Sequence, residues 1–232
     1  MTKNLTISAM KANRLFWLGR YEERVYMTLH LLRQCYDKMI DGDAKDYEEF
    51  WHKLDATNSY GTPEDFRLGM MYDDKNPCSI ISELNCAKDN AILLREDIMS
   101  ETLSYIELSI AHMNKCKEKK ESNITQLQPI TDWALSFWGS TLQRITNYKI
   151  MSLIVIGRNV ELLDLLIRFD YPFERIQMVY EDIKRHGENV NRIFDSIISN
   201  QLDDLLTPYQ YEHQDMEYRN KVLKYINHLV LV

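Results

Sequence analysis

Two arginines and a glutamate lie close together near the start of the sequence. Arg20, Glu23 and Arg24 belong to the run Trp17-Leu18-Gly19-Arg20-Tyr21-Glu22-Glu23-Arg24. On a helix, Arg20 and Glu23 share a face and can form an ion pair. Arg24 lies one turn after Arg20, so two guanidinium groups can converge on a carboxylate or phosphate with bidentate geometry. The run therefore predicts either an ion-pair network that fixes helix register or a site for an anionic ligand or partner.

The pattern Gly-Arg-x-x-Glu occurs a second time, from Gly157 to Glu161. Glycine inside a helix costs about 1 kcal/mol relative to alanine, so Gly19 and Gly157 indicate close approach of another helix. We predict that the two Gly-Arg helices cross near these glycines. The crossing would bring together the polar residues Arg20, Glu23, Arg158 and Glu161. Trp17 lies beside this group, and Arg95 either extends the network or forms a surface pair with Glu96.

The elements expected to position these residues are long helices. Apolar residues recur in steps of three and four from Leu15 to Met39 and leave out only position 22, which predicts one helix over about residues 8–40. Similar seams predict helices over about 78–117 and 148–169. Seven glycines and five prolines in 232 residues disfavour sandwiches and barrels, which need frequent turns. We therefore expect an all-α, multi-helix bundle in a single domain, residues 1–232, with two similar halves, 8–128 and 129–232.

Several classes of function are disfavoured. The net charge of -7 argues against nucleic-acid binding. No apolar run approaches the roughly 20 residues of a membrane span, and no signal peptide is recognised, so a cytoplasmic location is expected. Four cysteines form no CxxC pair, and Glu49-Phe50-Trp51-His52 is one Glu-x-x-His where a di-iron bundle needs two. With no P-loop or dinucleotide motif either, we expect no metal and no cofactor.

The run at residues 17–24 resembles the signature of the bacterial alpha-E family, named for its helices and Glu-Arg motif. Three further segments are similar to family motifs: Asn76-Pro77-Cys78-Ser79-Ile80, then Ala87-Lys88-Asp89-Asn90-Ala91 with Leu94-Arg95-Glu96, and Ile156-Gly157-Arg158-Asn159-Val160-Glu161. The sequence departs from the pattern at Glu22, usually apolar, and at Leu162, where the second copy normally has arginine.

The resemblance implies no established activity. Members of the family are commonly encoded beside, or fused to, circularly permuted ATP-grasp proteins and transglutaminase-like proteins. It thus implies a non-enzymatic accessory protein of a peptide-modifying system, with an ATP-grasp ligase-like or transglutaminase-like partner. One alternative is an enzyme or enzyme subunit in which Arg20, Arg24 and Arg158 hold a peptide or amino-acid carboxylate and Glu23 or Glu161 acts as general acid or base. Another is a structural homo-oligomer. The sequence does not specify the oligomeric state.

Overall fold

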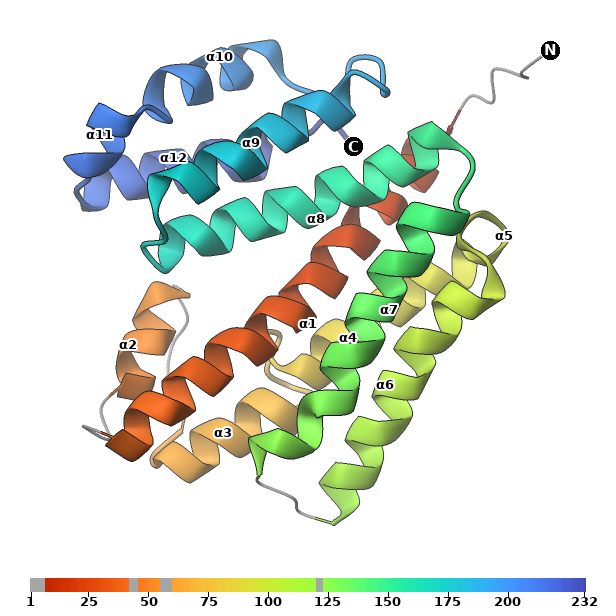
Figure 1. The fold of residues 1–232 in the computed structure, drawn as a ribbon, viewed down its shortest axis with the longest axis vertical. Coiled ribbons are helices and arrows are strands. Elements are labelled where there is room, and N and C mark those ends of the chain that lie inside the picture. The colour runs from red at the N-terminus through yellow and green to blue at the C-terminus, as the bar shows by residue number, and fades with distance from the viewer. Residues whose placement is uncertain (1–6, 42–45, 55–59, 120–122) are drawn as a thin grey trace. The chain divides into compact units, whose positions relative to one another are not determined.

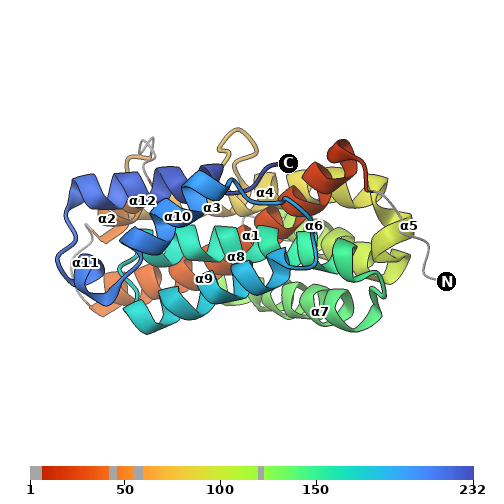
Figure 2. The same ribbon diagram turned by 90° about the horizontal axis from the view of Figure 1, so that it is seen from above.

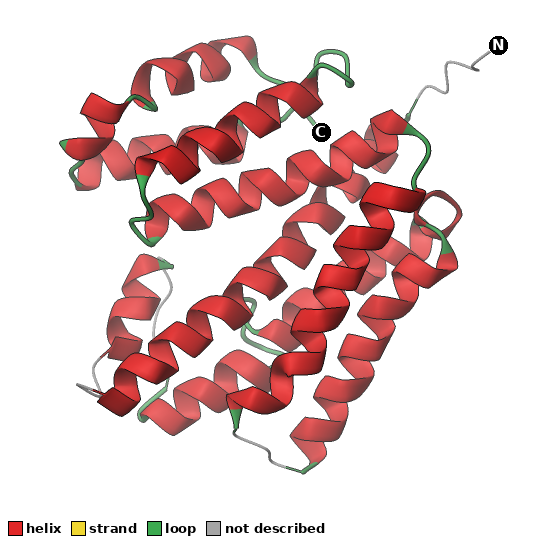
Figure 3. Ribbon diagram, in the orientation of Figure 1, coloured by secondary structure: helices red, strands yellow, loops and turns green. Residues whose placement is uncertain are grey.

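Every regular element of the computed structural model is helical (Figure 3). The structure describes residues 7–41, 46–54, 60–119 and 123–232. Over these ranges it has twelve α-helices, one short 3-10 helix and no strand; a single antiparallel bridge joins Phe194 and Val230. The predicted all-α class is confirmed. The predicted similarity of two halves stays a prediction, as does the single-domain boundary.

The chain divides by spatial contact into two compact units, which we call the terminal unit (Met1–Arg20 and Thr146–Val232) and the central unit (Tyr21–Ile145). The first helix, α1 (Ala9–Asp41), is the long helix labelled in Figure 1. It contributes residues to both units. Arg20 is the last residue of α1 in the terminal unit, and Arg24 belongs to the central unit.

The terminal unit is organised around α8 (Tyr148–Arg168). The Asn147 side chain caps this helix by accepting the backbone N–H groups of Lys149 and Ile150. Residues on all sides of α8 are buried, as expected for a core helix. Helices α9 and α12 pack against α8, and α10 packs against α12. The bounds are α9 Phe173–Gly187, α10 Ser196–Leu205, α11 Pro208–Glu212 and α12 Met216–His228.

The central unit contains the remainder of α1 and the helices that follow it. Helices α6 and α7 pack against each other and lie side by side in both ribbon views (Figures 1 and 2). Helix α4 packs against both α3 and α6. The bounds are α2 Asp46–Lys53, α3 Pro63–Tyr72, α4 Ile80–Leu93, α5 Arg95–Ile98, α6 Ser100–Glu118, η1 Ile124–Leu127 and α7 Gln128–Arg144.

The prediction of one continuous helix over 78–117 is wrong. The chain breaks at Leu94 and again at Met99, whose φ of 72° lies in the left-handed region. Because α4 contacts α6, the chain reverses direction through the short helix α5. Leu94 and Ile98 at the reversal are fully buried, which offsets the strain of Met99, whose φ of 72° and ψ of 149° cost a residue other than glycine about 1–3 kcal/mol. No glycine or proline marks the break, so the sequence carried no signal for it.

Candidate functional site

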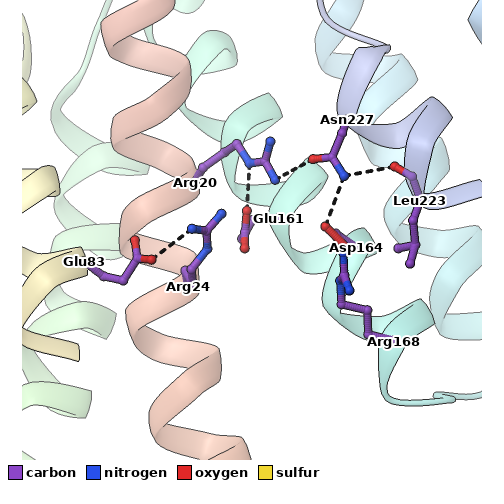
Figure 4. Close-up of polar contacts among 8 residues, drawn as sticks. All are labelled: Arg20, Arg24, Glu83, Glu161, Asp164, Arg168, Leu223 and Asn227. Carbon is purple, nitrogen blue, oxygen red and sulfur yellow. Dashed lines mark hydrogen bonds and ion pairs between the residues drawn. The ribbon is translucent and has the colours of Figure 1, made fainter. Parts of the chain in front are cut away.

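Helices α1 and α8 are in backbone contact at two glycines. A β-carbon added to Gly19 would lie 2.0 Å from the carbonyl oxygen of Ile154, and one added to Gly157 would lie 1.9 Å from the carbonyl oxygen of Phe16. These separations are far below van der Waals contact, so neither position accepts a larger residue unless the helices move apart. The contact places Arg20 of α1 beside Glu161 of α8 (Figure 4).

The Arg20 guanidinium is buried and bonded on two sides (Figure 4). Its Nε donates to Glu161 Oε2 at 2.7 Å, and its Nη2 donates to Asn227 Oδ1 at 3.0 Å. The side chains of Arg20 and Glu161 are only 6% and 3% exposed. The Trp17 ring centroid lies 5.0 Å from Arg20 Cζ, close enough for cation–π attraction. Arg20 and Glu161 therefore form a buried and compensated ion pair.

Asn227 connects this pair to a second one. Its Nδ2 donates to Asp164 Oδ1 at 3.4 Å, and to the carbonyl oxygen of Leu223 at 2.9 Å. The other carboxylate oxygen of Asp164 accepts from Arg168 Nε at 2.6 Å. Burial raises the pKa of Asp164, and the neighbouring Glu161 carboxylate raises it further. The result is a chain of two arginines and two carboxylates bridged by one carboxamide, with balanced formal charge.

Three residues of this network were not predicted from the sequence: Asp164, Arg168 and Asn227. Asp164 and Arg168 carry a usable signal, because residues four apart on a predicted helix can pair. Asn227 carries none. It lies 207 residues from Arg20, and the two meet because α12 packs against α8.

Arg24 forms a separate ion pair inside the central unit. Its Nη1 donates to Glu83 Oε1 at 2.9 Å, with Glu83 in the first turn of α4. The Glu83 side chain is 3% exposed, whereas that of Arg24 is 27% exposed. This pair attaches α1 to α4 and leaves part of the Arg24 side chain at the surface.

The other predicted site residues lie on different elements. Glu23 is fully buried on α1, and Arg158 is half-buried on α8. Arg95 is exposed on α5, and none of the ion pairs described above involves it. Its role in the polar network stays a prediction.

Glu22 is a buried carboxyl group at the position that interrupts the apolar seam and departs from the family pattern. The residue is 2% exposed, and its Oε1 has no hydrogen-bond partner among the described residues. Burial raises the pKa of Glu22 to about 8, with a smaller contribution from Glu23. Glu22 is therefore largely protonated at neutral pH.

A serine and a histidine meet between α8 and α9. Ser152 Oγ lies 3.2 Å from His186 Nδ1 and accepts a hydrogen bond from Asn189 Nδ2 at 3.0 Å. The serine oxygen has two lone pairs, so the tautomer of His186 decides whether Ser152 donates to or accepts from its Nδ1. Ser152 is fully buried. A nucleophile must reach its substrate, so this cluster acts as a polar contact between the helices.

No group of three His, Cys, Asp or Glu side chains among the described residues is arranged to hold a metal ion. Within the same part of the chain, no helix is both long and apolar enough to cross a bilayer.

These features define a class of protein: an all-helical domain whose Gly-Arg helix crosses a second one and buries an arginine–glutamate pair. The chain belongs to the Alpha-E family, described as a predicted alpha-helical domain with a conserved ER motif, and the match covers residues 8–199. Glu23-Arg24 has the residues of that motif. No curated protein and no solved structure matches the chain.

Proposed function

We propose that this chain is a non-enzymatic accessory protein of a peptide-modifying system. In this proposal the buried arginines and glutamates fix the helix arrangement, and the helical surface binds a protein partner. The observation that carries it is the state of Arg20, whose Nε and Nη2 both donate to acceptors of the chain itself. With the side chain 6% exposed, Arg20 is poorly placed to bind an incoming anion. A buried, compensated pair of this kind specifies register more than it adds stability.

Membership in the Alpha-E family supports the choice of partner. The expected partner is an ATP-grasp ligase-like or transglutaminase-like protein, because proteins of these two classes are commonly encoded beside family members. A fold can host many functions, so the choice between these two partners is decided by a binding experiment.

The test is co-expression of the full chain with the ATP-grasp-type and the transglutaminase-like protein encoded nearest to it in its host. We expect a complex of defined stoichiometry with at least one of them in size-exclusion chromatography with light scattering. A surface variant such as Met178→Asp, at a 69% exposed position of α9, tests whether complex formation tolerates an unrelated surface change. If neither protein binds the chain at micromolar concentrations, the proposal is wrong.

A second candidate, an enzyme subunit that binds a peptide carboxylate, is favoured by the partial exposure of Arg24. A guanidinium that is anchored by Glu83 and still reaches solvent can pair with a ligand carboxylate. Titration of a short peptide with a free C-terminus tests this candidate. The candidate is supported if binding is lost both with the Arg24→Gln variant and with a C-terminally amidated peptide. It is contradicted if the amidated peptide still binds the native chain, even when Arg24→Gln abolishes binding.

A further inference from the structure

A pocket of about 500 Å³ lies in the central unit, apart from the arginine–glutamate pairs. It is formed by Tyr60, helix α3 and the C-terminal part of α6. Much of its wall is apolar and comes from Tyr60, Leu68, Gly69 and Tyr72. Pockets that bind small ligands or peptide side chains enclose roughly 300–1,000 Å³. This pocket has that volume but is shallow and wide open to solvent, so it suits one long side chain laid against its wall and does not enclose a ligand.

The Tyr60 wall of this pocket is held from several sides. Its hydroxyl donates to Asp73 Oδ2 at 2.9 Å and accepts from Asn76 Nδ2 at 3.2 Å. The ring stacks on Trp51 with centroids 5.9 Å apart. It also fills the space beside Gly69, where an added β-carbon would lie 2.1 Å from Tyr60 Cζ. The wall is therefore preorganised, which reduces the entropy lost when a ligand binds.

The charged groups of the pocket are mostly negative. Asp65, Asp73 and Asp74 line it, together with one cation, Lys117. The Lys117 Nζ lies 3.9 Å from Asp74 Oδ2, and both side chains are well exposed, so the ammonium compensates the carboxylates only weakly. The backbone N–H of Lys75, followed by the hydroxyl of Tyr60, holds the pKa of Asp73 below its usual value. The lining thus keeps an excess of negative charge at neutral pH.

We infer that this pocket binds a lysine or arginine side chain from a segment of a partner protein. The methylene groups of such a side chain match the tyrosine and leucine walls, and its cationic end matches the carboxylates. An acidic segment would meet like charge. A lone divalent ion would meet mostly apolar wall, and no three acidic side chains among the described residues are arranged to bind one. The inference rests on the proposed function, because it presupposes a protein partner and specifies the chemistry of the segment that binds.

The first experiment is an NMR titration of the isotope-labelled full chain with the peptide acetyl-Gly-Lys-Gly-amide. The control peptide carries an acetylated lysine, which has a similar shape and no charge. We expect saturable amide shifts around Tyr60, Gly69 and Lys117 with the charged peptide only, and weaker binding as salt is raised. Equal shifts with both peptides, shifts confined to other residues, or no shifts at millimolar peptide would each overturn the inference.

Substitutions provide the second experiment. Asp65→Asn and Asp74→Asn should each weaken binding of the charged peptide about two- to fivefold, the range expected for exposed ion pairs. Lys117→Gln removes the competing ammonium and should strengthen binding by a similar factor. Glu64→Gln is the matched control, since Glu64 belongs to the same helix as Asp65, has a 62% exposed side chain and does not line the pocket. Equal affinity in all four variants would also overturn the inference.

The two proposals can fail separately. If the chain forms a complex with an ATP-grasp-type or transglutaminase-like protein, and that complex is as tight with Asp74→Asn as with the native chain, the pocket inference fails and the proposed function stands. If the charged peptide binds at the pocket but neither protein forms a complex, the proposed function fails and the pocket stands.

Discussion

Replacing Glu22 should change how the stability of this protein depends on pH. The carboxyl group is 2% exposed, and burial raises its pKa to about 8 from a reference of 4.5. Between these two pH values the folded chain keeps a proton on Glu22 that the unfolded chain releases. Unfolding is therefore favoured as pH rises, and the contribution of Glu22 to stability falls from pH 4.5 until about pH 8.

The size of the effect follows from the pKa difference. One pKa unit corresponds to about 1.4 kcal/mol, so the free energy of unfolding loses about 3 kcal/mol between pH 4.5 and pH 7 through Glu22 alone. Glu22→Gln keeps the size of the side chain and removes the titration. The stability difference between Glu22→Gln and the native chain should therefore grow in favour of the variant by about 1.4 kcal/mol per pH unit. Glu22→Leu completes the apolar seam and should be more stable still at pH 7, because it buries no polar group.

The assay is urea unfolding at a series of pH values between about 5 and 8, followed by circular dichroism. Subtracting the native curve removes the titration of all groups that are shared by the two proteins. Glu64→Gln is the control for the loss of a surface carboxylate, since its side chain is 62% exposed. A flat difference between Glu22→Gln and the native chain would refute the reasoning, because it would mean that Glu22 is ionised in the folded chain. The carboxyl carbon shift of Glu22 in NMR provides an independent check.

Three further predictions concern the crossing of α1 and α8 and the polar network beside it. Gly157→Ala should destabilise the chain by about 1–3 kcal/mol in urea unfolding, because the added carbon meets the carbonyl oxygen of Phe16 in a packed interface; an unchanged midpoint would contradict the close contact. Arg20→Met should cost about 3–5 kcal/mol by removing the guanidinium that bonds to the buried Glu161 carboxylate, and the double variant Arg20→Met with Glu161→Leu should recover much of that loss. If the double variant is instead less stable than the single one, the ion pair adds net stability as well as fixing the helix register. Asn227→Ala should cost about 1–3 kcal/mol, since a buried arginine donor loses its acceptor, and hydrogen exchange should show α12 protected less than before.

Much of the fold could be predicted because its signals are local. The apolar seam from Leu15 to Leu32 follows from the helical repeat, and these side chains are indeed buried. The helix predicted over about residues 148–169 is likewise present as α8, Tyr148–Arg168, because its apolar seam is also local. The two glycines were informative for a similar reason, since each costs stability in an isolated helix and so signals a neighbour that comes close.

Other features required the tertiary structure. The reversal between α4 and α6 depends on burying Leu94 and Ile98 among residues distant in sequence, and Met99 accepts a left-handed φ for that reason. The partner of Arg20 beyond Glu161 is Asn227, and nothing in the residues around either one indicates the other. The burial of Glu22 is of the same kind: the sequence shows a carboxyl group at a seam position, but only the packed interior shows that water is excluded from it and that its proton is held. Local spacing determines which face a residue occupies, whereas its solvation and its distant partners are properties of the assembled chain.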